Sequence, residues 1–132
     1  MDFQICVYTS PAVDLLYFLS TSPSPDVIEN NKDILINEYL STLSATMKQL
    51  DCKTQPPTKE ELIASMKRRA AYEMITLFTI LPIILVDKNE VKDIDEIMNK
   101  DGYTNPGYKN ETYKKIMMKR MPMYDEWGLL DV

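Results

Sequence analysis

The 132-residue sequence contains no histidine. This absence excludes histidine as a general base, the Ser-His and Cys-His nucleophile pairs, and most zinc sites. The two cysteines, Cys6 and Cys52, are far apart and form no CxxC pair, which argues against structural zinc and thioredoxin-like chemistry. Because two free thiols are typical of a reducing compartment, we expect a cytoplasmic protein.

Basic charge is scarce, and so are long apolar runs. Fifteen lysines and arginines face twenty acidic residues, so the formal net charge is -5 and a nucleic-acid partner is disfavoured. The longest apolar run, residues 74–86, is interrupted by two threonines and Pro82. It is shorter than the roughly 20 residues that cross a bilayer. Residues 1–20 also lack the basic start of a secretory signal. We therefore expect no membrane partner.

The residues that are present predict a mainly α protein. A hydrophobic fraction of 45% and a charged fraction of 27% are typical of one globular domain with one core. Residues 2–8 are expected to be at most a residual short strand at the N-terminus. Helical spacing of apolar residues predicts helices over the following ranges: residues 12–20, 25–50, 59–81, 93–100 and 111–121.

Local signals mark several of these helix ends. Ser24 before Pro25 is typical of a helix cap, Thr58 with Glu61 forms a capping box, and Asn110 is suited to cap the last helix. Pro82 is expected to kink or end the long third helix, because proline lacks a backbone donor. The segment 101–109 is expected to be a loop, and the helix at 12–20, apolar almost all round, is expected to be buried.

Two acidic residues near the N-terminus are candidates for chemistry. Asp2-Phe3-Gln4 is similar to the turn of kinases in which an aspartate holds the Mg²⁺ that bridges the ATP phosphates. The alternative is a surface aspartate beside a core phenylalanine. Asp14 lies inside an apolar helix, where it either finds partners for a buried carboxylate or occupies a narrow exposed edge. The residues alone leave both alternatives open.

Taken together, these segments resemble the ecdysteroid kinase-like family, whose members are relatives of choline and aminoglycoside kinases. The resemblance is carried by these stretches: residues 2–6, 10–19, 24–27, 39–43, 108–110 and 124–131. It implies that residues 1–132 form a single partial domain, the helical C-lobe portion of a protein-kinase-like fold. It also implies that Asp2 and Phe3 belong to the cofactor-binding turn, with Asp2 as the metal ligand, and that Asp14 is the structural anchor behind the catalytic loop. Full-length relatives would use ATP and Mg²⁺ on a small-molecule hydroxyl acceptor, steroid-like or choline-like.

The sequence also departs from this family. The family's H-G-D-x-W-x-N-N catalytic loop precedes the D-F-Q turn, and with no histidine the motif cannot lie within residues 1–132. The glycine-rich nucleotide loop and its phosphate-binding lysine are also missing, and Thr9 stands where family members often have glycine. We therefore assign no catalytic residue. We expect the isolated chain to bind ATP and Mg²⁺ poorly and to be inactive.

A second hypothesis is a non-catalytic helical interaction or scaffold protein derived from a kinase C-lobe. Without an N-lobe, apolar surface around Phe3, Ile5 and the first helix would face solvent. Exposed apolar patches mark interfaces or self-association. The first hypothesis therefore treats this surface as part of a kinase domain, and the second treats it as an interaction surface.

Overall fold

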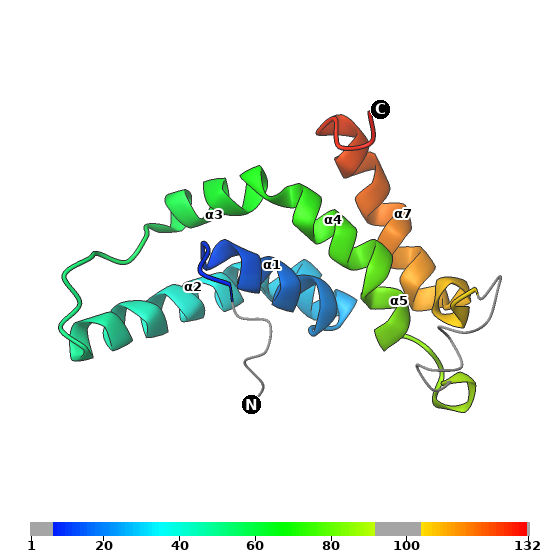
Figure 1. The fold of residues 1–132 in the computed structure, drawn as a ribbon, viewed down its shortest axis with the longest axis horizontal. Helices are drawn as coiled ribbons and strands as arrows, with labels where there is room; N and C mark the ends of the chain where they lie inside the picture. The colour runs from blue at the N-terminus through cyan, green and yellow to red at the C-terminus, as the bar shows by residue number, and fades with distance from the viewer. Residues whose placement is uncertain (1–6, 92–103, 132) are drawn as a thin grey trace. The chain divides into compact units, whose positions relative to one another are not determined.

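The computed structural model describes residues 7–91 and 104–131, and these residues are mainly helical, as predicted (Figure 1). No strand occurs among them, and residues 7 and 8 carry no regular structure. The rest of the expected N-terminal strand and the expected helix at 93–100 lie outside the described residues. The elements are α1 (Ala12–Thr21), α2 (Pro25–Gln49), α3 (Lys59–Arg68), α4 (Ala70–Thr79), α5 (Leu81–Ile84), η1 (Lys88–Glu90), η2 (Pro106–Lys109) and α7 (Glu111–Glu126).

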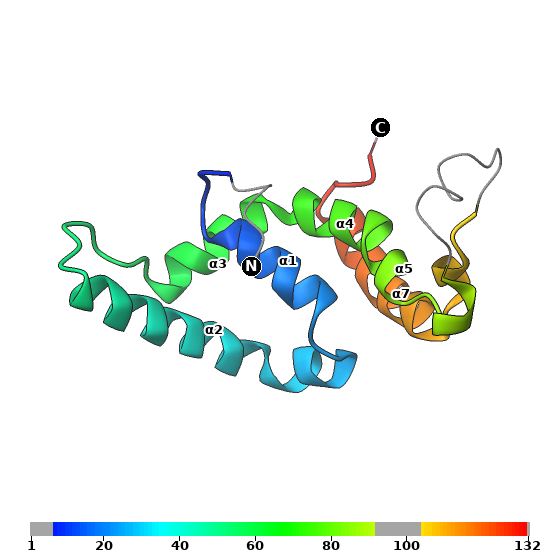
Figure 2. The same cartoon turned by 60° about the horizontal axis from the view of Figure 1, so that its bottom comes forward.

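The chain divides into two compact units, Met1–Tyr72 and Glu73–Val132. Each unit has its own apolar cluster among the described residues. In the first unit, α1 packs against α3, and α3 contacts α2 (Figures 1 and 2). The buried residues of this cluster are Ala12, Leu15, Leu16, Leu19, Ile36, Leu62 and Met66.

The burial of α1 differs from the prediction. Only one face of the helix is buried, whereas Tyr17 and Phe18 on another face are 42% and 47% exposed. The buried residues recur three and four positions apart, which is the spacing of a single helix face. The described neighbours of α1 cover only that face. The other face therefore stays exposed although it is also apolar.

The predicted caps of the first unit are confirmed. The Ser24 side chain accepts a hydrogen bond from the backbone N–H of Val27, with Pro25 at the first helical position of α2. The Thr58 hydroxyl accepts from the Glu61 N–H at 3.2 Å, and the Glu61 carboxylate accepts from the Thr58 N–H at 2.8 Å. This reciprocal pair satisfies two backbone donors that a helix start would otherwise leave unpaired.

The predicted long third helix is interrupted at Arg69, which separates α3 from α4. The Arg69 N–H bonds to the Met66 carbonyl, and the Arg69 carbonyl accepts from the Tyr72 N–H, so both bonds span three residues instead of four. The Arg69 guanidinium also donates to the backbone oxygen and the hydroxyl of Ser65, at 3.2 and 2.7 Å. These contacts stabilise a tight turn where apolar spacing alone predicts a continuous helix.

Pro82 ends the regular helix, as predicted, and η2 compensates for the interruption. Proline has no N–H for the carbonyl four residues earlier, that of Phe78. The Tyr108 hydroxyl donates to this carbonyl at 2.9 Å. Gly107 lies so close to Pro82 that an added Cβ would stand 1.7 Å from the Pro82 oxygen. The expected loop at 101–109 is therefore wrong for residues 106–109, which form a short 3-10 helix against α5.

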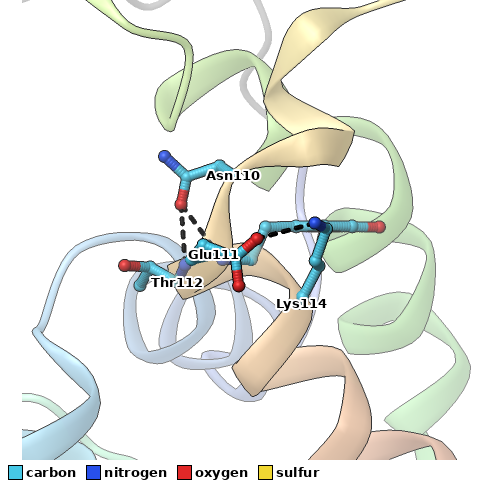
Figure 3. A network of polar contacts seen from close by, with 5 residues as sticks. Asn110, Glu111, Thr112 and Lys114 are labelled. Carbon is cyan, nitrogen blue, oxygen red and sulfur yellow. Dashed lines mark hydrogen bonds and ion pairs between the residues drawn. The ribbon is translucent and has the colours of Figure 1, made fainter.

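Asn110 caps α7, as predicted (Figure 3), and its side chain also contacts the segment before η2. Its Oδ1 accepts from the N–H groups of Thr112 and Tyr113 at 2.8 and 3.3 Å, while its Nδ2 donates to the Leu85 carbonyl at 3.0 Å. In the first turn, Lys114 lies 2.7 Å from Glu111. The hydrogen bond from Lys114 and its positive charge hold the pKa of Glu111 below its ordinary value.

The predicted end of the last helix, near residue 121, is wrong. The helix α7 continues through Pro122 to Glu126. Proline leaves the Met118 carbonyl without its usual helical donor, but the Met118 side chain is 76% exposed, so water can reach this turn. Beyond the proline, Tyr124 is completely buried. Its packing in the second cluster, with Leu77, Leu81, Tyr113 and Met117, favours continuation of the helix.

Replacing the Tyr108 hydroxyl tests its role beside Pro82. We expect Tyr108→Phe to lower the free energy of unfolding by about 1 kcal/mol, because the Phe78 carbonyl loses its donor. Tyr8→Phe is the matched control, since Tyr8 is fully exposed, and it should change stability little. Urea titrations followed by circular dichroism measure both values. Equal stability of the two variants would contradict the compensation.

Candidate functional site

The proposed magnesium–nucleotide turn lies outside the described residues. Asp2 and Phe3 both belong to residues 1–6, so their assignment as metal ligand and cofactor-binding residue stays a prediction. The segment that follows them is held in place at the start of α1. The Ser10 hydroxyl lies 3.0 Å from the Ser65 hydroxyl of α3, and it also accepts from the Ala12 N–H at 3.3 Å.

Asp14 lies in the first turn of α1 and is exposed. Its exposure agrees with the interpretation that it occupies an open edge of the helix. The described residues do not test whether it anchors a catalytic loop. The charge of Asp14 affects a side chain of α2. The pKa of Tyr39 is raised mainly by burial and, to a smaller extent, by the negative charge of Asp14.

The described residues alone do not fit a magnesium–ATP site. Among them, no group of three or more histidine, cysteine, aspartate or glutamate side chains gathers in a way that could hold a metal ion. Magnesium prefers near-octahedral oxygen coordination and uses carboxylates together with substrate phosphates. Asp14 by itself offers one carboxylate, so we derive no catalytic step through the metal or the nucleotide.

A polar cluster that sequence reasoning missed lies in the second unit. Glu73 of α4 is 6% exposed and forms an ion pair with Arg120 of α7 at 3.4 Å. Nearby, the hydroxyl of Tyr124 is buried and has no hydrogen-bond partner among the described residues. Burial raises the pKa of Tyr124 strongly, and the Glu73 charge raises it further, while Arg120 opposes them.

The physical role of this cluster is structural. A tyrosine whose neutral form is favoured so strongly does not act as a nucleophile or a base at neutral pH. The ion pair joins α4 to α7, and a buried pair of this kind is costly to break because one charge is left uncompensated. The sequence does contain a signal for it: Glu73 is spaced seven residues from Met66 and four from Leu77, on the apolar side of the predicted helix.

No helix in the described parts of the chain has the length and apolar character needed to cross a membrane. The thiol of Cys52 is free and exposed at the end of α2. Neither observation adds a group to the candidate site, which rests on Asp2, Phe3 and Asp14.

Comparison with known proteins supports a kinase-like relationship for the N-terminal part of the chain. Residues 1–52 match the sequence model of the Ecdysteroid kinase-like family. This match confirms the resemblance over the segment that holds Asp2, Phe3 and Asp14. No curated protein and no solved structure shows significant similarity to the chain.

The electrostatic contact between α1 and α2 can be tested directly. We expect Asp14→Asn to lower the pKa of Tyr39, because a nearby negative charge disfavours the tyrosinate. The pKa should stay above the ordinary value, since burial, the larger cause, remains. Titration of the tyrosine ring carbons by NMR measures the shift, with Asp51→Asn as a charge-matched control. An unchanged Tyr39 pKa in Asp14→Asn would contradict the contact.

The unpaired hydroxyl of Tyr124 gives a second test. We expect Tyr124→Phe to raise the free energy of unfolding by about 1 kcal/mol, because a buried hydroxyl without a partner carries an uncompensated desolvation cost. Tyr17→Phe, at an exposed position, should leave stability unchanged. Chemical denaturation provides the measurement. A loss of stability in Tyr124→Phe would show that the hydroxyl is hydrogen-bonded in solution.

Proposed function

Because residues 1–52 match the ecdysteroid kinase-like family, we propose that this chain is the C-terminal part of an ATP-dependent small-molecule kinase. The kinase would transfer the terminal phosphoryl group of ATP to a hydroxyl group of its acceptor, steroid-like or choline-like. The observation that supports this proposal is the position of the match, since it covers both candidate acids.

In this proposal each candidate residue has a distinct role. Asp2 holds the magnesium ion, and Phe3 fixes the metal-binding turn by packing. Asp14 braces the backbone behind the catalytic loop. Its carboxylate is exposed on α1, so a segment outside residues 1–132 can reach it. The contacts of Ser10 with Ser65 and with the N–H of Ala12 hold the start of α1 against α3.

We further propose that residues 1–132 alone do not catalyse phosphoryl transfer. This reaction depends on positioning and on electrostatic stabilisation of the phosphates, and a single metal-binding aspartate supplies little of either. The catalytic base of the family lies in an H-G-D-x-W-x-N-N motif, which the histidine-free sequence does not contain. The reading frame upstream of Met1 is therefore expected to encode this motif.

The alternative is a non-catalytic helical interaction or scaffold protein. The exposure of Tyr17 and Phe18 supports it, because two large aromatic side chains of one helix face solvent. Surfaces of this kind mark interaction sites or self-association. In this alternative, nucleotide would not stabilise the chain, and the exposed face of α1 would contact a protein.

The kinase proposal predicts a difference between two purified proteins. The 132-residue chain should show no ADP release with ATP, Mg²⁺ and hydroxyl acceptors, whereas the protein extended through the upstream frame should phosphorylate an acceptor. In the extended protein, Asp2→Asn should lower kcat at least about a hundredfold, since it removes a group that stabilises the transferring phosphate. Asp26→Asn, an exposed acid of α2, is the charge-matched control and should retain activity.

Two results would contradict the proposal. One is a stop codon immediately upstream with no frame that encodes the motif. The other is an extended protein that is folded but inactive with every acceptor, and whose melting temperature does not change with ATP and Mg²⁺. That second result, together with self-association of the chain, would favour the scaffold alternative.

A further inference from the structure

Three serines near the start of the chain are each followed directly by proline. They are Ser10, before α1, and Ser22 and Ser24, in the connection between α1 and α2. Proline-directed protein kinases phosphorylate serines in this position, provided that the hydroxyl is accessible and the backbone around it is extended. The sequence alone does not distinguish the three serines, but their structural surroundings do.

Ser10 is occupied by structural contacts. Its side chain is half-buried, and its hydroxyl lies 3.0 Å from the Ser65 hydroxyl of α3. The same hydroxyl accepts from the Ala12 N–H at 3.3 Å. A phosphate group on Ser10 would have to break the contact with α3, so this serine is a poor acceptor in the folded chain.

Ser22 is exposed, but it ends a helix. Its backbone is helical, with φ -104° and ψ -47°, and its N–H donates to the Phe18 carbonyl in the last turn of α1. An extended conformation at Ser22 would break this bond. A phosphate group at this position would also face the negative end of the α1 dipole, which is unfavourable.

Ser24 combines exposure with an extended backbone. Its φ of -63° and ψ of 156° lie in the extended region, and Pro25 follows at the first helical position of α2. The Ser24 hydroxyl accepts from the Val27 N–H at 3.4 Å, which is long for a hydrogen bond of this type. Little is therefore lost when the hydroxyl turns toward an enzyme.

We propose that Ser24 is a phosphorylation site for a separate, proline-directed protein kinase. The Ser24 oxygen forms a bond to the γ-phosphorus of ATP held by that kinase, and the bond from this phosphorus to the bridging oxygen of ADP breaks. The hydroxyl proton passes to the catalytic base of the kinase, and ADP leaves. The chain is the acceptor in this step, so the inference goes beyond its proposed function and does not depend on it.

The modification acts on the start of α2, a helix of 25 residues. Phosphate oxygens are stronger acceptors than the hydroxyl for the Val27 N–H, and the negative charge of the phosphate is favourable at a helix N-terminus. Asp26, in the same first turn, opposes part of this gain because it carries a like charge. Phosphorylation of Ser24 therefore stabilises the helix to a degree that Asp26 limits.

Phosphorylation of the folded chain by a purified proline-directed protein kinase tests the assignment. The 132-residue chain is incubated with this kinase, ATP and Mg²⁺, and the modified residue is located by mass spectrometry of its fragments. We expect phosphate on Ser24. Ser24→Asn should lower incorporation at least about tenfold and keep the fold, since asparagine caps a helix as well as serine does. Ser22→Asn is the matched control and should retain incorporation.

Urea denaturation of the phosphorylated and unmodified chains tests the consequence. Phosphorylation should lower the equilibrium constant of unfolding about threefold, because the phosphate charge is favourable at the start of α2. The gain should be larger in Asp26→Asn, which lacks the like charge. It should shrink in about 1 M salt, which screens an exposed charge.

Four results would overturn the proposal. Phosphate on Ser10 or Ser22 in place of Ser24 would show that another serine is the acceptor. Modification of a synthetic peptide of residues 18–30, but not of the folded chain, would show that the fold hides Ser24. Failure of the kinase on both would show that the surrounding sequence is no substrate. Lower stability after phosphorylation would show that repulsion from Asp26 outweighs the favourable contacts.

Discussion

The one-sided packing of α1 is the constraint on which this account of the molecule depends. Ten residues with a single charge offer apolar surface in every direction, yet the described residues of α2 and α3 cover only one face. The other face is left to solvent or to a partner. The exposure of Asp14 follows from this packing, because a fully covered helix would bury the carboxylate at a high cost in free energy.

The features that local chemistry determines could be predicted from the sequence. The Thr58–Glu61 capping box, the Ser24 cap and the Asn110 cap each depend on side chains within three residues of the backbone groups they satisfy. The end of the helix at Pro82 follows from a missing N–H. The family resemblance could also be recognised from short stretches, and it is confirmed over residues 1–52.

The features that could not be predicted depend on individual side-chain contacts, some local and others between elements. Periodicity does not reveal that Arg69 bonds to Ser65 and tightens the turn there, or that burial of Tyr124 carries α7 past Pro122. The exposure of Tyr17 depends on which elements pack against α1. The amino-acid composition of the helix does not reveal this. The Glu73–Arg120 pair joins residues 47 positions apart in sequence (120 − 73 = 47). For the candidate site, the role of Asp2 stays a prediction, whereas the exposure of Asp14 is now described.

Hydroxyl-radical footprinting of the purified chain tests the exposed face of α1 most directly, because it reports the solvent access of individual side chains. The account predicts that Tyr17 and Phe18 are oxidised rapidly, in contrast to the fully buried Tyr124. Protection of Tyr17 and Phe18 to the level of Tyr124, in a chain that is monomeric at the concentration used, would contradict the account.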